Sequence, residues 1–308
     1  MTAILRVAVL CVVEARPLVL GVSLLRFLTG VALALPVAAA HDHPLTILRG
    51  ALAWVLSILA VYLFNGVTDV VEDRINASGR PIARGDLDPA HAMAVAAVAA
   101  WVALLATLGL PGPMLWIIAG NLVLGYLYSG PPVPLKGSAG GTMGVLCLSG
   151  MLAYLGGFVV ATGGADVALP PALMLFAAVA ICWMMFVGVP AKDLSDIQGD
   201  AAAGRRTLGV RVGERRSRCV MIVAAFALLT FFALAVVLFR VPLVGVSLAL
   251  AVGVAAVTTT GLLAPAPVPV PGPDGSAAVE ERSRRRRSYG AFMGTQHLVH
   301  LTALVCHI

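Results

Sequence analysis

Residues 51–73 read ALAWVLSILAVYLFNGVTDVVED, an apolar run that ends in three acidic side chains. The apolar segment around it, 45–70, exceeds the roughly 20 residues that a helix needs to cross a bilayer. Ionisable groups are costly at membrane depth, so acids at the end of a span need a compensating partner. This stretch therefore predicts a membrane-spanning helix with a functional site at its polar end.

The whole chain shares this apolar character. Of its 308 residues, 60% are hydrophobic and only 12% are charged, and the mean hydropathy is +0.96. Soluble domains are about 25% charged, and a soluble globule of this length cannot bury so much apolar surface. The composition excludes a soluble enzyme, a disordered chain and a nucleic-acid-binding domain, and it predicts a polytopic membrane protein.

Apolar segments of spanning length recur along the chain. We predict about nine transmembrane helices at 17–40, 45–70, 89–110, 112–129, 140–163, 169–190, 219–239, 241–264 and 289–308. Residues 2–14 are apolar but too short to cross, so we expect them to lie along the membrane interface. We predict no removable signal peptide, because no small-residue cleavage site follows a short apolar core.

Basic residues are distributed unevenly between the predicted loops. Of the 21 Lys and Arg residues, 18 precede the first span or lie in loops after even-numbered spans. Cytoplasmic loops of membrane proteins collect such residues. We therefore expect a multi-pass protein of the cell membrane with a cytoplasmic N-terminus and an external C-terminus. The Pro-rich and Arg-rich stretch 265–287 is expected to be a flexible loop against anionic headgroups.

Two acidic clusters lie on this basic side. Each occupies one helix face: Asn65, Asp69 and Asp73 at i, i+4, i+8, and Asp193, Asp196 and Asp200 at i, i+3, i+7. Like charges at this spacing repel, and acids oppose the dipole at a helix C-terminus. A chain that carries both penalties twice is expected to bind a cation there, unless the acids are ordinary solvated loop charges. We expect Glu72 on a different face from Asp73.

Oxygen ligands of this kind favour Mg²⁺, Mn²⁺ or Ca²⁺. Mg²⁺ prefers one or two carboxylates together with substrate phosphates, so two opposed clusters would hold two or more Mg²⁺ ions bridging a diphosphate. Four basic residues near the clusters are candidates for the remaining phosphate oxygens: Arg80, Lys136, Lys192 and Arg205. The alternative is that these residues only set the membrane topology.

Polar side chains inside predicted spans are functional candidates by default. They are Arg26, Asn121, Tyr126, Tyr128, His297 and His300. Arg26 has the alternative of snorkelling or pairing with an acid. His297 and His300 share a helix face and serve either as a base or as buried bundle residues.

These residues resemble the two signature motifs of the UbiA superfamily of intramembrane prenyltransferases. The similarity covers roughly 16–216 and includes further short segments: Arg80-Pro81-Ile82, Tyr126-Leu127-Tyr128-Ser129 and Lys192-Asp193. One position departs from the pattern, because many members carry Asp directly after the motif Asn and this chain has Gly66. The departure leaves the number and placement of metal ligands open.

The resemblance implies an all-α bundle of about nine transmembrane helices around a central cavity with a cytoplasmic cap. It implies one domain over 1–308, with pseudo-repeat halves at roughly 17–130 and 140–264. It also implies Mg²⁺-dependent ionisation of an isoprenyl diphosphate and prenyl transfer to an aromatic or other lipophilic acceptor. The catalytic residues would be Asp69, Asp73, Asp196 and Asp200.

Two other activities remain open at this point. A UbiA-type terpene cyclase would ionise the same substrate but capture the cation with the substrate's own double bonds. A cation transporter with two acidic repeats would be expected to place its ion sites near the bilayer midplane. The clusters here lie at the ends of predicted spans, which disfavours the transporter.

Overall fold

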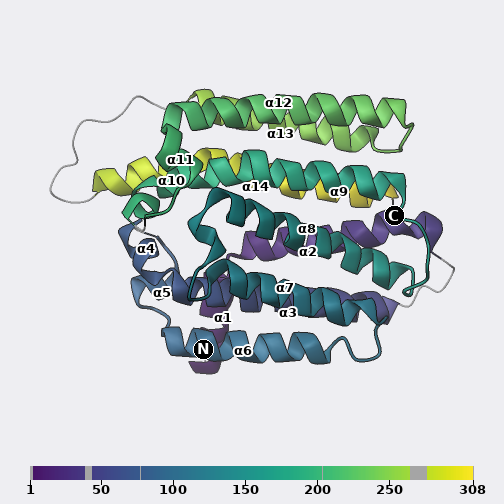
Figure 1. Ribbon diagram of the computed structural model, residues 1–308, viewed down its shortest axis with the longest axis horizontal. Helices are drawn as coiled ribbons and strands as arrows, with labels where there is room; N and C mark the ends of the chain where they lie inside the picture. The colour runs from purple at the N-terminus through teal and green to yellow at the C-terminus, as the bar shows by residue number, and fades with distance from the viewer. Residues whose placement is uncertain (1–2, 39–43, 77, 203, 264–275, 308) are drawn as a thin grey trace.

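The computed structural model describes residues 3–38, 44–76, 78–202, 204–263 and 276–307. All regular structure in these residues is helical, and the long helices run side by side (Figure 1). An isolated parallel bridge joins Ser138 and Arg206. The structure confirms the prediction of an all-α chain.

The long helices of the first part of the chain are α2 (Pro17–Ala34), α3 (Pro44–Thr68), α6 (Pro89–Leu105), α7 (Pro113–Ser129) and α8 (Ala139–Ala161). Those of the second part are α9 (Pro171–Trp183), α10 (Val189–Ala202), α12 (Glu214–Leu238), α13 (Val244–Leu262) and α14 (Ser276–His307). A π-helical segment, Met184–Gly188, joins α9 to α10.

Six helical segments of the described residues are long and apolar enough to cross a membrane. They are Pro17–Val37, Pro44–Thr68, Ala139–Ala161, Pro171–Ile197, Glu214–Leu238 and Val244–Leu262. The helices α6 and α7 are apolar but shorter. The chain is therefore a multi-pass integral membrane protein, while the count of nine spans stays a prediction.

The helix α2 lies at the centre of the bundle, where it packs against α3, α8 and α14. Its contact with α8 depends on glycine. A Cβ on Gly30 would overlap the backbone of Tyr154, and a Cβ on Gly157 would overlap the backbone of Phe27. Membrane helices use such small residues to bring their backbones close together.

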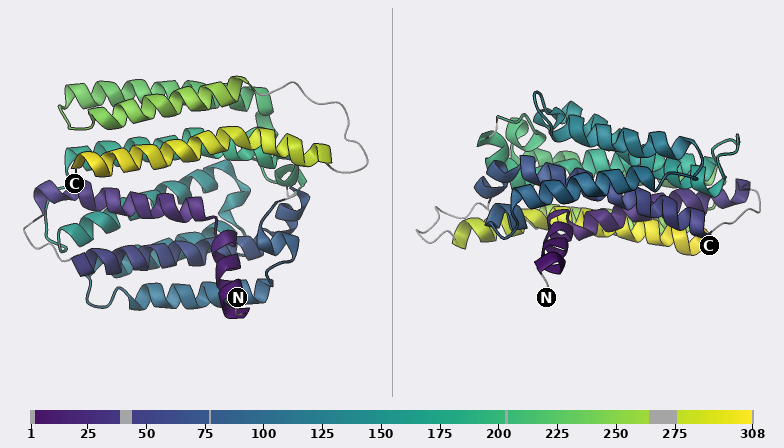
Figure 2. Two further views of the ribbon diagram at one scale, coloured as in Figure 1. Left: turned by 180° about the vertical axis from the view of Figure 1, so that it is seen from behind. Right: turned by 90° about the horizontal axis from the view of Figure 1, so that it is seen from below.

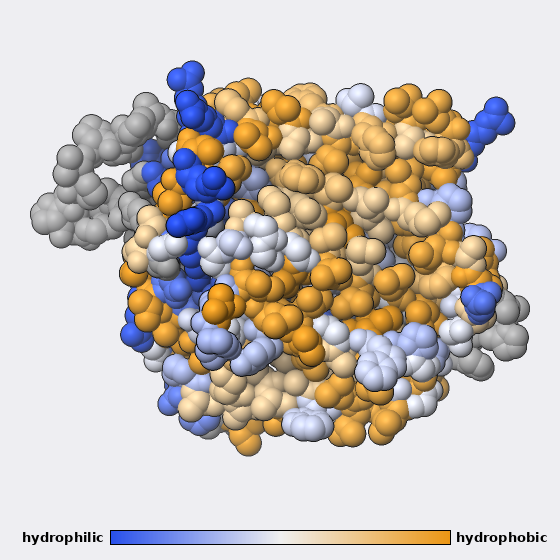
Figure 3. All heavy atoms as spheres, viewed as in Figure 1, coloured by the Kyte–Doolittle hydropathy of each residue, from blue (hydrophilic) through white to orange (hydrophobic). Residues whose placement is uncertain are grey.

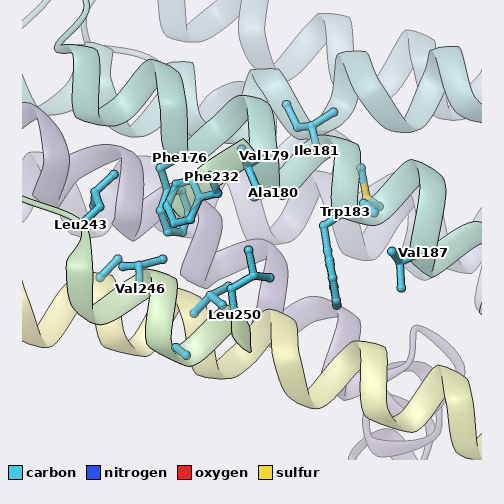
Figure 4. Packing of buried hydrophobic residues seen from close by; sticks show 14 of the residues in the cluster. Phe176, Val179, Ala180, Ile181, Trp183, Val187, Phe232, Leu243, Val246 and Leu250 are labelled. Atoms are coloured by element: carbon cyan, nitrogen blue, oxygen red, sulfur yellow. The ribbon is translucent and has the colours of Figure 1, made fainter. Parts of the chain in front are cut away.

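A buried apolar cluster holds the second part of the bundle together (Figure 4). Phe176 and Trp183 of α9 meet Phe232 of α12 and Leu250 of α13 there. The face seen in the space-filling view is largely apolar between its two ends (Figure 3), and many large apolar side chains are exposed, such as Trp116 at 76%. An apolar exterior around an apolar core is typical of a bundle surrounded by lipid.

Short elements gather at one end of the bundle, where hydrophilic side chains also concentrate (Figures 1 and 3). They are α4 (Val70–Ile75), α5 (Pro81–Arg84), α11 (Leu208–Val212) and the 3₁₀ turn η2 (Leu135–Gly137). The first helix, α1 (Ala3–Glu14), runs across the direction of the spans (Figure 2) and packs on α3, α5 and α6. A second 3₁₀ turn, η1 (Leu35–Val37), extends α2 at the opposite end.

The predicted flexible loop 265–287 is too long. Residues 276–287 form the first turns of α14, and residues 264–275 lie outside the described part of the chain. The stretch from Ser276 to Arg287 contains neither Pro nor Gly and is rich in Ala, Glu and Arg. These residues have high helix propensity, so the last helix begins well before its apolar segment.

Candidate active site

A cavity of about 180 Å³ lies between α2, α3, α7, α8, α10 and α14 and reaches the end where the short elements gather. Twelve of the sixteen candidate residues line it: Arg26, Asn65, Asp69, Asp73, Asn121, Tyr128, Lys136, Lys192, Asp193, Asp196, Asp200 and Arg205. Both acidic clusters therefore face a single cavity.

The first cluster sits at a break between two helices. The helix α3 ends at Thr68 and α4 begins at Val70, with Asp69 as its N-cap residue. The Asn65 amide donates to Oδ2 of Asp69 over 2.9 Å, and its own oxygen accepts from Ser129 Oγ over 2.7 Å. These bonds hold the Asp69 carboxylate at the cavity wall.

Glu72 also lines this cavity, next to Asp73 on α4. The i, i+4, i+8 spacing of the first cluster assumed one uninterrupted helix from Asn65 to Asp73. The structure has two helices meeting at Asp69, and facing directions cannot be extrapolated across such a break. Glu72 is a residue of the cavity wall that the sequence analysis did not count among the candidates.

The second cluster lies on α10, directly after the π-helical segment. Pro190, in the first turn of α10, lacks the N–H that a continuous α-helix would use there, and π-helical turns are frequent at functional sites. The backbone N–H of Gly199 donates to the side-chain oxygen of Asn76 over 2.9 Å. This bond ties the second cluster to the segment that follows the first.

One guanidinium bridges the two clusters. Nη2 of Arg205 lies 2.9 Å from Oδ1 of Asp69 and 2.9 Å from Oε1 of Glu72, while Nη1 lies 3.2 Å from Oδ1 of Asp200. The ammonium of Lys136, which is buried, lies 2.6 Å from the same oxygen of Asp69. Carboxylates that are more than 100 residues apart in sequence thus contact the same guanidinium group.

The pKa values of Asp69 and Asp200, one carboxylate from each cluster, are shifted in opposite directions. Burial alone would raise the pKa of Asp69, but Lys136 and Arg205 outweigh it and lower that pKa below its usual value. Burial raises the pKa of Asp200 above its usual value despite the nearby Arg205. Oδ2 of Asp200 is buried without a hydrogen-bond partner. The second cluster therefore has capacity for additional positive charge.

In the described ranges, no three His, Cys, Asp or Glu side chains already converge on one metal position. The carboxylates are instead paired with cations of the protein, and Lys192 adds a further pair with Asp196 at 3.1 Å. The donor set is rich in carboxylate oxygen, which suits a hard divalent cation. The carboxylates that would bind such a cation line one cavity, and in this structure they form ion pairs with Lys and Arg side chains.

A model of the UbiA prenyltransferase family matches residues 23–265, a range that contains both acidic clusters and most of the cavity wall. This chain belongs to that family. The fold agrees, because a UbiA homolog from Archaeoglobus fulgidus, solved with GPP and Mg²⁺, superposes with a TM-score of 0.65. That comparison covers 95% of this chain and 99% of the other at 17% identity.

Relatives of known name match the UbiA chain over part of its length. The digeranylgeranylglyceryl phosphate synthase of Natronomonas pharaonis is 36% identical over 172 residues, which are 54% of this chain and 58% of that protein. The homogentisate phytyltransferase of Synechocystis sp. is 30% identical over 171 residues, 53% and 54% of the two chains. The chain thus spans a little more than half the length of these curated relatives.

Arg80 is not among the described residues that line the cavity of this UbiA chain. Its buried guanidinium lies behind the first cluster, with Nη1 2.7 Å from Oδ2 of Asp73 and Nε 2.7 Å from Oε1 of Glu14. It is therefore placed to hold a carboxylate rather than to contact a diphosphate. The sequence offered little signal for Glu14 beyond an acid at the end of an apolar segment.

Three further candidates lie away from the cavity. The hydroxyl of Tyr126 donates to the carbonyl of Pro131 over 3.1 Å, on a side chain that is half exposed. His297 contacts the carbonyl of Met293 at 2.8 Å. His300 is fully buried and lies 2.8 Å from the hydroxyl of Tyr154. The structure supports a packing role for His300, one of the two alternatives that the sequence left open.

We expect His300→Ala to destabilise the protein by about 2 kcal/mol, because the buried Tyr154 hydroxyl loses its partner. The measurement is thermal unfolding in detergent, with His297→Ala as a control on the same helix. In the described part of the chain, the His297 ring contacts a backbone carbonyl of its own helix, so its loss should be smaller. Equal stability of the His300 variant and the wild type would contradict the packing role.

The inner part of the cavity carries a few polar groups. Arg26 donates to Oε1 of Gln296 and contacts the sulfur of Met184, each at 3.2 Å. Asn121 donates to Ser57 Oγ over 3.0 Å and accepts from Ser149 Oγ over 2.7 Å. Sequence reasoning missed Arg16, Tyr62 and Tyr289, which also line the cavity.

Proposed function

We propose that this chain ionises an isoprenyl diphosphate and transfers the prenyl group to an aromatic or other lipophilic acceptor, with release of diphosphate. The convergence of both acidic clusters on Arg205 at the polar end of a membrane cavity is the observation that carries this proposal. The activities for which the synthase and phytyltransferase relatives are named, and the GPP and Mg²⁺ in the A. fulgidus homolog, support it.

Six side chains would hold two or more Mg²⁺ ions: Asn65, Asp69, Asp73, Asp193, Asp196 and Asp200. The anionic Asp69 and the unpartnered oxygen of Asp200 suit such a ligand set. When bound, Mg²⁺ supplies Lewis-acid stabilisation of the charge that develops on the leaving diphosphate. Asp69, Asp73, Asp196 and Asp200 act as catalytic residues through this contact.

The basic residues of the site take the other diphosphate oxygens. Lys136 and Arg205 neutralise carboxylates in the structure, and a bound diphosphate offers them stronger, more highly charged acceptors. The Lys192 side chain is 34% exposed and lies on the same cavity. These three side chains would orient the diphosphate so that its ester bond points into the bundle.

The rest of the cavity excludes water from the reaction. Apolar side chains from four helices line it below the acids: Val19, Val22, Ile58, Val61, Leu124 and Leu146. Each buried CH₂ of a prenyl tail contributes about 0.8 kcal/mol. A dry lining also protects the allylic cation from water until the acceptor attacks. Among the polar groups that line the cavity, Arg26, Asn121 and Tyr128 are the ones we propose to contact that acceptor.

We propose further that the chain resides in the cell membrane with its N-terminus and both clusters on the cytoplasmic side. The concentration of Lys and Arg in one set of loops supports this orientation. The hydrophilic side chains at one end of the bundle lie where such loops would meet the headgroups (Figure 3).

The test uses purified protein in nanodiscs with Mg²⁺ and geranyl, farnesyl or geranylgeranyl diphosphate, with pyrophosphate release and extracted products as readouts. We expect release only when an aromatic compound or a lipid extract is added, and no release with EDTA. Rapid release without acceptor, together with a cyclic product, would contradict transfer and identify a terpene cyclase. No release with any substrate, together with Mg²⁺-coupled uptake into vesicles, would identify a transporter.

A further inference from the structure

Gly66 leaves an opening behind the first cluster that another residue fills. A Cβ at this position would overlap Oε1 of Glu14 and Nη2 of Arg80. The backbone of α3 is therefore in direct contact with an ion pair, and only a residue without a side chain permits it. The acid in this opening comes from α1, 52 positions earlier in the sequence.

The contacts of Glu14 are those of a built site. Its side chain is 0% exposed. Oε1 lies 2.7 Å from Nε of Arg80, and Oε2 accepts from the backbone N–H of Ile82 over 2.9 Å. The carbonyl of Glu14 also accepts from Nη2 of Arg80 over 3.2 Å. A buried carboxylate is stable only when it is paired and hydrogen-bonded in this way.

The other edge of the Arg80 guanidinium faces the cavity wall. Nη1 lies 2.7 Å from Oδ2 of Asp73, which lines the cavity. Glu14 and Asp73 thus hold the guanidinium from two sides. If Glu14 were lost, the positive charge of Arg80 would be left to Asp73 alone. The planar guanidinium favours bidentate binding of a single carboxylate.

We infer that Glu14 is a positioning residue: it fixes Arg80, and through Arg80 it orients the Asp73 carboxylate toward the cavity. Gly66 is the second component, because it makes the room that the Glu14 carboxylate occupies. This inference rests on the proposed function in one respect, namely that Asp73 binds a metal ion. The Glu14–Arg80–Asp73 arrangement itself involves no metal or substrate.

The geometry allows the acid to be moved from one helix to the other. In an aspartate the carboxylate oxygens lie about 2.4 Å from Cβ, as the covalent bond lengths require. The Cβ of an Asp at position 66 would occupy the space that Oε1 of Glu14 fills, and Nη2 of Arg80, 2.6 Å from that Cβ, would have to shift slightly to meet the new carboxylate. Glu14→Ala combined with Gly66→Asp should rebuild the contact with Arg80 from α3.

The experiment compares four proteins in detergent: wild type, Glu14→Ala, Gly66→Asp and the double variant. The first readout is the midpoint of thermal unfolding with EDTA and without substrate. We expect each single variant to unfold at a lower temperature and the double variant to unfold closer to the wild type than either. Asp86→Asn, which removes an exposed acid paired with Arg84, is the matched control and should match the wild type.

The second readout is Mn²⁺ binding in the presence of inorganic pyrophosphate, followed by the loss of free Mn²⁺ signal in electron paramagnetic resonance. We expect Glu14→Ala to weaken binding at least about tenfold and the double variant to recover most of it. A double variant no better than the singles in unfolding would overturn the inference, whether or not the protein transfers prenyl groups. Wild-type Mn²⁺ binding by a folded Glu14→Ala protein would also overturn it.

These outcomes are separate from those that test the proposed function. A wild-type protein that binds Mn²⁺ and pyrophosphate but turns over no prenyl diphosphate would contradict the proposed activity. The unfolding comparison of the four proteins would still decide the role of Glu14, since it needs neither metal nor substrate.

Discussion

Asp69→Asn should lower kcat/KM for the prenyl diphosphate by at least about a thousandfold, which corresponds to about 4 kcal/mol of transition-state stabilisation. Asp69 contacts Asn65, Lys136 and Arg205 together. Asn keeps the volume and the contact with Asn65 but removes the negative charge. The measurement is steady-state pyrophosphate release in nanodiscs, and Asp196→Asn should show a loss of similar size.

Asp86→Asn is the control for this experiment, because it removes a carboxylate whose ion pair with Arg84 is exposed. Surface pairs of this kind contribute little, so both stability and turnover should stay at wild-type values. Full activity of Asp69→Asn, in a protein with an unchanged unfolding midpoint, would refute the two-cluster site.

Arg205→Gln should have its largest effect when no metal is present. Removing the guanidinium leaves Asp69, Glu72 and Asp200 facing one another without their shared cation. Arg205, Asp69 and Glu72 are partly buried, so the loss should be smaller than the about 3–5 kcal/mol that breaking a fully buried ion pair costs. We therefore expect a lower unfolding midpoint with EDTA than for the wild type, and a larger stabilisation by added Mg²⁺, because divalent ions no longer compete with Arg205.

The same variant should also raise KM for the diphosphate, since one donor to its oxygens is lost. Arg206→Gln is the matched control: the residue is adjacent, exposed, and bonded through its backbone to Gly137 rather than to the clusters. If Mg²⁺ stabilises Arg205→Gln no more than it stabilises the wild type, Arg205 does not occupy the position that a metal would neutralise.

Patterns that repeat within one helix could be predicted from the sequence. Apolar length located the spans, and the i, i+4 and i, i+3 spacings placed Asn65, Asp69 and Asp196 on faces that the structure turns toward one cavity. The polar group at the end of an apolar run is a local signal, and it is strong because exposure of charge to lipid is so unfavourable. The repeat-related halves and the nine spans remain predictions.

Contacts between distant segments could not be predicted in this way. Arg80 lies near the first cluster in sequence, and charge alone does not say whether it faces a ligand or a carboxylate. Its partner Glu14 is 66 residues away and was hidden in a segment expected only to lie on the membrane surface. Glu72 contacts Arg205, which is 133 residues away in sequence, and His300 contacts Tyr154 across the bundle.

The glycine contact between α2 and α8 limits how a substrate can enter from the lipid. Both helices line the cavity, yet at Gly30 and Gly157 their separation is set by backbone atoms. The separation of the helices at these two positions therefore cannot change by a change of rotamer. If the proposed function is correct, we expect a prenyl substrate to enter the cavity between another pair of helices.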